Sequence, residues 1–90
     1  MSEADQDPVV RKLRDEIAAN DLTLLEAFNR RLELVRQLKE HKDEHGIDFV
    51  DPEQEKRLLD RLAAVNRGPF SEEAVRELYR VLLDLTKGEV

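Results

Sequence analysis

Two cations on one predicted helix have the types and the spacing that could do chemistry. Arg31 and Lys42 interrupt an apolar stripe at positions where further apolar side chains are expected. They are eleven residues apart, which is about 16 Å along a helix and nearly the same angular position. Cations inside a burial stripe are costly unless an anion meets them there. The pair therefore predicts a site for a small anion between two long side chains.

Arg14 is a third candidate, and it implies a second copy of the chain. It precedes Arg31 by seventeen residues, or about 25 Å along the same helix, so it cannot reach the anion from its own chain. In an antiparallel dimer, Arg14 of one subunit can approach Arg31 of the other. Arginine suits this role because its planar fork meets a carboxylate with two hydrogen bonds.

Each of these cations also has a plainer explanation. Arg31 follows Arg30 and can be an exposed surface residue. Lys42 near a helix end can complement the helix dipole, and Arg14 can pair with nearby acidic side chains. The pattern alone leaves both explanations open for each residue.

The other polar candidates are explained by local structure or lack partners. Asp51 is typical of a helix cap, Gln54 of its capping-box partner and Glu55 of a solvated helix residue. His41 and His45 are four residues apart, but no third metal ligand is positioned, so no metal site is predicted. The sequence shows no nucleophile–base pair and no Gly-rich phosphate loop. It predicts no cofactor.

Three helices must position these residues, and the first is very long. It is predicted from Pro8 to about His45, with Asp7 as its cap and Gly46 placed to end it in a left-handed conformation. Residues 1–6 are predicted to form a frayed tail. The apolar stripe shares one helical face and consists of Val10, Leu13, Ile17, Leu24, Phe28, Val35 and Leu38.

The two further helices are short and medium in length. The short one starts at Asp51-Pro52 and runs to about Asn66, and the medium one starts at the Ser71 cap and can end at Gly88. The inward residues are predicted to be Leu58, Leu59, Leu62 and Val65 in the short helix, and Val75, Leu78, Tyr79, Leu82 and Leu85 in the medium one.

The length of the first helix predicts a homodimer. Its 38 residues span about 57 Å, whereas a compact domain of this size has a radius of gyration of about 12 Å. The helix cannot bury its whole stripe against the rest of its own chain, and a second copy is the simplest cover. The predicted fold class is therefore all-α, with residues 7–90 as one helical domain that dimerises.

Composition limits the partners. The chain is 40% charged and 40% hydrophobic, with no Trp, which fits a helical bundle better than a sheet protein. A net charge of −6 argues against nucleic acid or an anionic membrane surface as a partner. There is no cysteine for a disulfide framework, and no apolar run reaches membrane-spanning length. These features predict a soluble, cytoplasmic protein.

In their order and spacing, several segments resemble the all-helical chorismate mutases. The segments are Leu13-Arg14-Asp15-Glu16-Ile17, Asp21, Arg30-Arg31-Leu32-Glu33-Leu34, Lys42 and Asp51-Pro52-Glu53-Gln54-Glu55, and the resemblance extends to Thr86. It implies an intertwined homodimer of three-helix chains with two active sites. It also implies that the substrate is the dianion chorismate, which is rearranged to prephenate in aromatic amino acid biosynthesis.

The resemblance implies a role for each site residue. Arg31, together with Arg14 of the other subunit, would hold the two substrate carboxylates. Lys42 would hydrogen-bond the ether oxygen, and Asp51 and Glu55 would lie by the ring hydroxyl. The full set of implied substrate-binding residues is Arg14, Arg31, Lys42, Asp51, Gln54, Glu55 and Thr86, with Thr86 near a carboxylate.

Two positions depart from the family pattern, and alternatives follow. Gln54 stands where the family usually has Arg, and Val90 stands where a Gln helps to bind the ether oxygen. The alternatives are a sibling activity on the same scaffold, acting on 4-amino-4-deoxychorismate or eliminating pyruvate from isochorismate, and a non-catalytic dimeric binding or regulatory module. The turn Gly68-Pro69-Phe70 resembles family members related to an aromatic-pathway synthase, so an aromatic-pathway enzyme is a candidate partner.

Overall fold

The computed structural model describes residues 6–90, which form three α-helices and no strand within that range. The all-α prediction is confirmed. Of the predicted tail, residues 1–5 lie outside the described part of the chain. The chain divides into two compact units, Met1–Glu33 and Leu34–Val90. No helix in residues 6–90 has the apolar length that crossing a bilayer requires.

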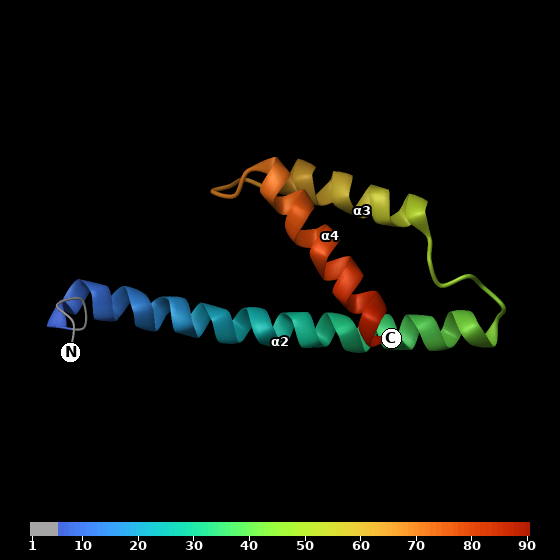
Figure 1. Ribbon diagram of the computed structural model, residues 1–90, viewed down its shortest axis with the longest axis horizontal. Helices are drawn as coiled ribbons and strands as arrows, with labels where there is room; N and C mark the ends of the chain where they lie inside the picture. Colours follow the sequence, from blue (N-terminus) through green and yellow to red (C-terminus); the bar gives the residue numbers. More distant parts are fainter. Residues whose placement is uncertain (1–5) are drawn as a thin grey trace. The chain divides into compact units, whose positions relative to one another are not determined.

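The first helix, α2, runs without interruption from Pro8 to Glu44 (Figure 1). It is capped as predicted, because Asp7 Oδ1 accepts hydrogen bonds from the backbone N–H groups two and three residues later, at 2.8 and 3.1 Å. None of its residues is buried. In the first unit the apolar stripe is open to solvent, with Leu13 50% and Ile17 60% exposed.

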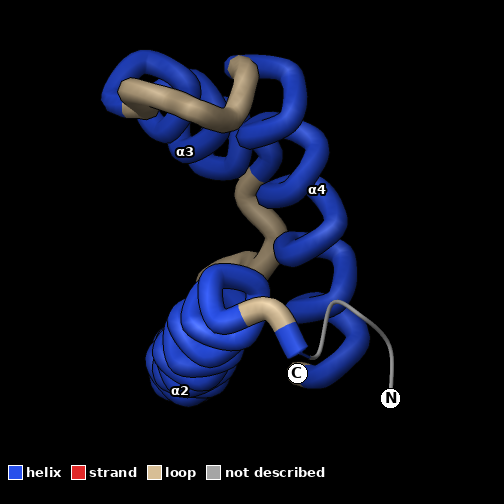
Figure 2. Tube along the Cα trace, turned by 90° about the vertical axis from the view of Figure 1, so that its left-hand side faces the viewer, coloured by secondary structure: helices blue, strands red, loops and turns tan. Residues whose placement is uncertain are grey.

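A glycine ends α2, as predicted. Gly46 has a φ of +64°, in the left-handed region that glycine adopts at little cost. The N–H of Ile47 donates to the carbonyl of Lys42 at 2.8 Å. The last turn of α2 therefore closes on Lys42. The loop that follows α2 is drawn in tan in Figure 2.

The second unit also contains α3 (Pro52–Val65) and α4 (Glu72–Glu89), which pack against each other. Both begin at the predicted caps, Asp51 and Ser71, whose side-chain oxygens each accept a backbone N–H at 3.1 Å. The turn between them is held by Asn66. Its Nδ2 donates to the Phe70 carbonyl at 2.7 Å, while its Oδ1 accepts from a backbone N–H at 3.1 Å.

A charged side chain also joins the two shorter helices. Arg76 of α4 forms ion pairs with Asp60 of α3 at 2.9 Å and with Glu72 of its own helix at 3.1 Å. The hydrogen bonds to Asp60 and then to Glu72 raise the pKa of Arg76 above its ordinary value. Arg76 therefore links α3 to the start of α4.

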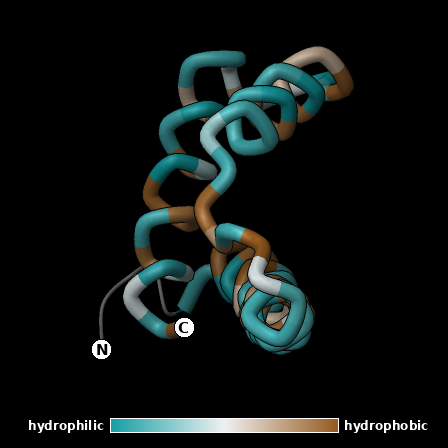
Figure 3. Tube along the Cα trace, turned by 90° about the vertical axis from the view of Figure 1, so that its right-hand side faces the viewer, coloured by the Kyte–Doolittle hydropathy of each residue, from teal (hydrophilic) through white to brown (hydrophobic). Residues whose placement is uncertain are grey.

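The predicted inward face of the shorter helices is confirmed only in part. Val75 is buried, and the half-buried members are Leu58, Leu59, Leu62, Tyr79 and Leu82. Three predictions are wrong for the single chain, because Val65, Leu78 and Leu85 are 62%, 44% and 64% exposed. Hydrophobic and hydrophilic segments alternate along α4 (Figure 3), and one packed neighbour covers only part of such a helix.

The last helix does not end at Gly88, where the sequence allowed it to end. α4 continues through Gly88 to Glu89, and the N–H of Val90 donates to the Thr86 carbonyl at 3.2 Å. Gly88 has no positive φ. Because the helical hydrogen bonds continue past it, this glycine stays within the helix rather than ending it.

Replacing Gly46 by Ala should lower the free energy of unfolding by about 1–2 kcal/mol, the cost of placing a Cβ in the left-handed region. No heavy atom lies within 4 Å of the added Cβ, so backbone strain is the whole expected effect. Gly46→Asn should lose less, since Asn tolerates this conformation. Urea unfolding at equal protomer concentration measures both, and a Gly46→Ala protein as stable as the wild type would contradict the assignment.

Candidate active site

The candidate residues fall in both units. Arg14 and Arg31 lie on the part of α2 in the first unit, where Arg14 is exposed and Arg31 is half-buried. Because α2 is continuous over both, the helical rise keeps them about 25 Å apart within one chain. The second unit contains the other candidates, Lys42, Asp51, Gln54, Glu55 and Thr86.

Lys42 is tied to the linker that follows α2. Its Nζ donates to the carbonyl oxygen of Phe49 at 3.3 Å, and the residue is half-buried. Lys39 lies over the Phe49 ring, with Nζ 5.8 Å from the centroid, and pairs with Asp43 at 2.8 Å. Phe49 thus contacts two lysines at the end of α2, Lys42 through its carbonyl oxygen and Lys39 through its ring. Lys42 also stands in the last turn of the helix, so an interaction with the helix dipole contributes as well.

Asp51 and Gln54 meet in the cap of α3. Asp51 Oδ1 accepts the Gln54 backbone N–H, as predicted. The Gln54 side chain does not complete the predicted capping box, because its Oε1 accepts instead from Nε and Nη2 of Arg57 at 3.3 and 3.1 Å. An arginine one turn further along α3 draws this oxygen away from the helix end.

The sequence pattern predicted that Glu55 is a solvated helix residue, but its side chain forms an ion pair. Its Oε1 pairs with Nζ of Lys87 at 2.7 Å, and the two side chains are 29% and 36% exposed. The contact joins the start of α3 to the end of α4. Sequence reasoning missed Lys87, because Glu55 and Lys87 stand on different helices and no periodicity links them. The only feature of the sequence that pointed to Lys87 was its position next to Thr86.

Thr86 is buried, with 8% of the residue exposed. Its Oγ1 donates to the Leu82 carbonyl at 2.7 Å, one turn earlier in α4. To hold a carboxylate, the hydroxyl would have to turn its proton away from that carbonyl. The structure therefore places Thr86 beside Lys87 at the end of α4 with its hydroxyl directed into its own helix.

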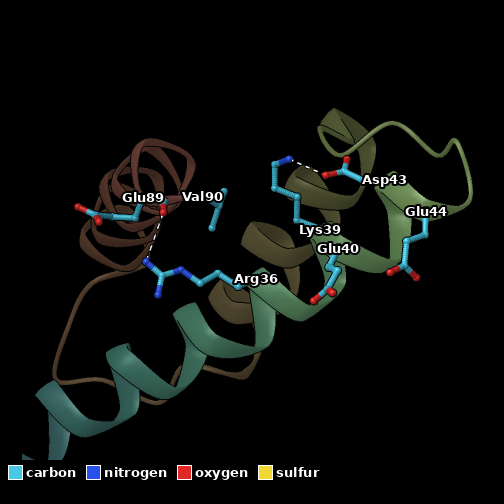
Figure 4. Close-up of a pocket in the computed structure, with 7 residues that line it drawn as sticks. All are labelled: Arg36, Lys39, Glu40, Asp43, Glu44, Glu89 and Val90. Atoms are coloured by element: carbon cyan, nitrogen blue, oxygen red, sulfur yellow. Dashed lines mark hydrogen bonds and ion pairs between the residues drawn. The ribbon is translucent and has the colours of Figure 1, made fainter.

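A groove of about 410 Å³ lies between the end of α2 and the end of the chain (Figure 4). Its lining residues are Arg36, Lys39, Glu40, Asp43, Glu44, Glu89 and Val90. Both cations are already engaged, Lys39 by Asp43 and Arg36 by the Glu89 carbonyl at 3.4 Å. With four carboxylate side chains, the groove is a poor match for a dianion, and none of the substrate-binding residues predicted from the sequence lines it.

The two histidines face each other without forming a metal site. The rings of His41 and His45 stack with centroids 4.2 Å apart, and His45 Nδ1 lies 2.8 Å from the His41 carbonyl oxygen. Among residues 6–90, no three His, Cys, Asp or Glu side chains are grouped so that they could hold a metal ion.

The described part of the chain has one very long helix and two shorter ones, and these helices and their caps carry the candidate cations and carboxylates. This is the arrangement of a small three-helix protein. Residues 13–89 match the model of the family described as chorismate mutase type II. This chain belongs to that family.

Solved structures and a curated relative agree with this family. Two structures of chorismate mutase from Thermus thermophilus, forms I and II, are each 28% identical to this chain. Their TM-scores are 0.84 and 0.86, covering 86% and 88% of this chain and 96% and 90% of theirs. The T-protein of Haemophilus influenzae is 36% identical over 73 residues, which is 79% of this chain. The chain spans only 19% of that protein's length.

Replacing Asp51 by Ala should lower the free energy of unfolding by about 1 kcal/mol, because the first turn of α3 loses its cap. Asp51→Asn should stay within a few tenths of a kcal/mol of the wild type, since Asn caps about as well as Asp. Urea unfolding measures both. Equal losses in the two variants would show that the carboxylate charge matters here and the cap does not.

Proposed function

We propose that this chain is a homodimeric chorismate mutase, an isomerase that rearranges chorismate to prephenate. The observation that carries the proposal is the family match over residues 13–89, which spans every candidate from Arg14 to Thr86. The chain keeps arginine at 14 and 31, lysine at 42 and carboxylates at 51 and 55.

The reaction requires the protein only to bind the substrate and to stabilise developing charge. It is a unimolecular pericyclic rearrangement, so the enzyme needs no general acid, base or nucleophile. It must hold the dianion in a compact chair-like conformer and stabilise the negative charge that grows on the ether oxygen as the C–O bond breaks. In this proposal Arg31 and Arg14 of the partner subunit clamp the two carboxylates.

Lys42 supplies the electrostatic contribution in this proposal. The ammonium has three N–H donors, so Lys42 can keep its bond to the Phe49 carbonyl and still donate to the ether oxygen. Its half-buried position supports the role, because a charge acts more strongly where water is partly excluded.

Gln54 would act as a neutral donor where relatives carry a cation. Its Oε1 is taken by Arg57 at 3.1 and 3.3 Å, which leaves its amide N–H₂ group as the part that can face a ligand. A neutral donor binds an anion less strongly than a guanidinium does. The proposal therefore relies more heavily on the remaining cations.

The dimer is supported by the uncovered apolar stripe. On α2, Ile17 is 60% and Leu24 44% exposed, and on α4 Leu85 is 64% exposed. Exposed apolar residues in a continuous helical stripe are typical of a surface that binds another chain. The second copy would also bring the partner's arginine, which the helical rise keeps about 25 Å from Arg31 in its own chain.

The site roles, the domain boundaries of 7–90 and a cytoplasmic location all remain part of this proposal. An aromatic-pathway enzyme as a protein partner is a further prediction, and the exposed Phe70, at 64%, would be accessible to it.

The proposal is tested by mixing the purified chain with chorismate. We expect the ultraviolet absorbance of chorismate to fall and the product to be prephenate. No loss of absorbance at high protein concentration would refute the mutase proposal and favour a non-catalytic dimer. Parallel incubations with 4-amino-4-deoxychorismate and isochorismate test the sibling activities.

Lys42→Ala should lower kcat by about 10²–10³-fold, as expected when one preorganised donor to a developing negative charge is removed. Steady-state kinetics on chorismate measures the loss, and circular dichroism checks that the helices remain. Lys56→Ala is the matched control, because it removes an exposed lysine from α3 and should leave kcat unchanged. Near-normal turnover by Lys42→Ala would exclude Lys42 from this role.

A further inference from the structure

We propose that Lys87 is a specificity-determining positioning residue, which acts through Glu55 to favour a substrate with a ring hydroxyl over one with an amine. This inference rests on the proposed function, since it concerns which ring substituent the same site accepts. It begins from the ion pair between Lys87 Nζ and Glu55 Oε1 at 2.7 Å. Neither the family match nor the sequence pattern assigns a role to Lys87.

The geometry fixes which part of Glu55 remains for a ligand. Lys87 engages one carboxylate oxygen, Oε1, at a short distance, and an ionised carboxylate has a second oxygen with accepting capacity. The backbone N–H of Glu55 donates to the Asp51 carbonyl at 3.1 Å, which fixes the residue in the first turn of α3. The second oxygen, Oε2, is therefore the acceptor that remains for a ring substituent.

Stability alone gives little reason for this contact. The two side chains keep 36% and 29% of their surface exposed, and ion pairs of this exposure contribute little to folding because water screens them. α3 and α4 also pack against each other without it, and Arg76 bridges α3 to the start of α4. The clearest consequence of the ion pair is that the Lys87 ammonium offsets the negative charge of the Glu55 carboxylate.

Charge is what separates the two ring substituents. A hydroxyl is neutral and donates to a carboxylate whether or not that carboxylate is paired, whereas an alkylamine is protonated at neutral pH. An unpaired Glu55 would attract the ammonium strongly. Pairing with Lys87 cancels that attraction and adds a like charge nearby. The same site then accepts the hydroxyl and disfavours the ammonium.

The test compares the binding of two substrates in the full-length chain. The KM of chorismate and the inhibition constant of 4-amino-4-deoxychorismate against chorismate turnover are measured for the wild type, Lys87→Met and Lys87→Gln. The inhibition constant is informative whether or not the amine is itself rearranged. Removing the ammonium should lower the ratio of inhibition constant to KM by about tenfold, and Lys87→Arg should keep the wild-type ratio.

Two controls separate this role from a structural one. Lys56→Met removes the same charge from an exposed position beside Glu55 and should not change the ratio. In a Glu55→Gln background, Lys87→Met should change the ratio less than it does in the wild type, because Lys87 is no longer held by the carboxylate and only its direct repulsion of the ammonium remains. A merely structural lysine would give the same ratio in the wild type and in every Lys87 variant.

The outcomes distinguish this inference from the proposed function. If folded Lys87→Met and Lys87→Gln keep the wild-type ratio to within about twofold, a change too small for the loss of a neighbouring charge, the inference is wrong and the mutase function stands. A Lys87→Met effect that is undiminished in the Glu55→Gln background also overturns it. A wild-type chain that does not turn over chorismate overturns both.

Discussion

An amphipathic helix of 37 residues cannot cover its own apolar stripe, and the rest of this protein depends on that constraint. α2 runs from Pro8 to Glu44 with no buried residue, and the remaining helices are too short to lie along all of it. Burying an apolar surface is the main favourable contribution to folding. In the proposed homodimer the stripe would be covered by another helix of matching length, the α2 of a second copy.

The same constraint decides how the proposed site would be assembled. Arg14 and Arg31 stand on one rigid helix, about 25 Å apart by its rise, so they can act on one small molecule only if they come from different copies. Lys42 lies at the other end of that helix, held to the linker through Phe49. A dianion site that uses all three cations needs both chains. In this account dimerisation does more than stabilise the fold, because it completes the binding site.

Sequence reasoning predicted the parts that local physics decides. The caps at Asp7, Asp51 and Ser71 and the left-handed end at Gly46 follow from residue type and position. Sequence reasoning failed where packing between helices determines which residues are buried and which side chains meet. Val65, Leu78 and Leu85 fit an inward face by periodicity and are exposed in the single chain, and the ion pair of Glu55 with Lys87 joins helices that no spacing relates. Gly88 shows that a glycine near a helix end does not stop the helix when the hydrogen bonds continue.

The central claim, a site shared between two copies, is tested most directly by mixing two inactive variants. Arg14→Ala and Lys42→Ala are purified separately, combined in equal amounts and allowed to exchange subunits, and chorismate turnover is measured before and after. Each mixed dimer then contains one site with both Lys42 and the arginine of the other copy intact, so about a quarter of the wild-type activity should return in a symmetric dimer with random exchange. If subunits exchange but the mixture shows only the average activity of the two separate variants, the site is not shared in this way.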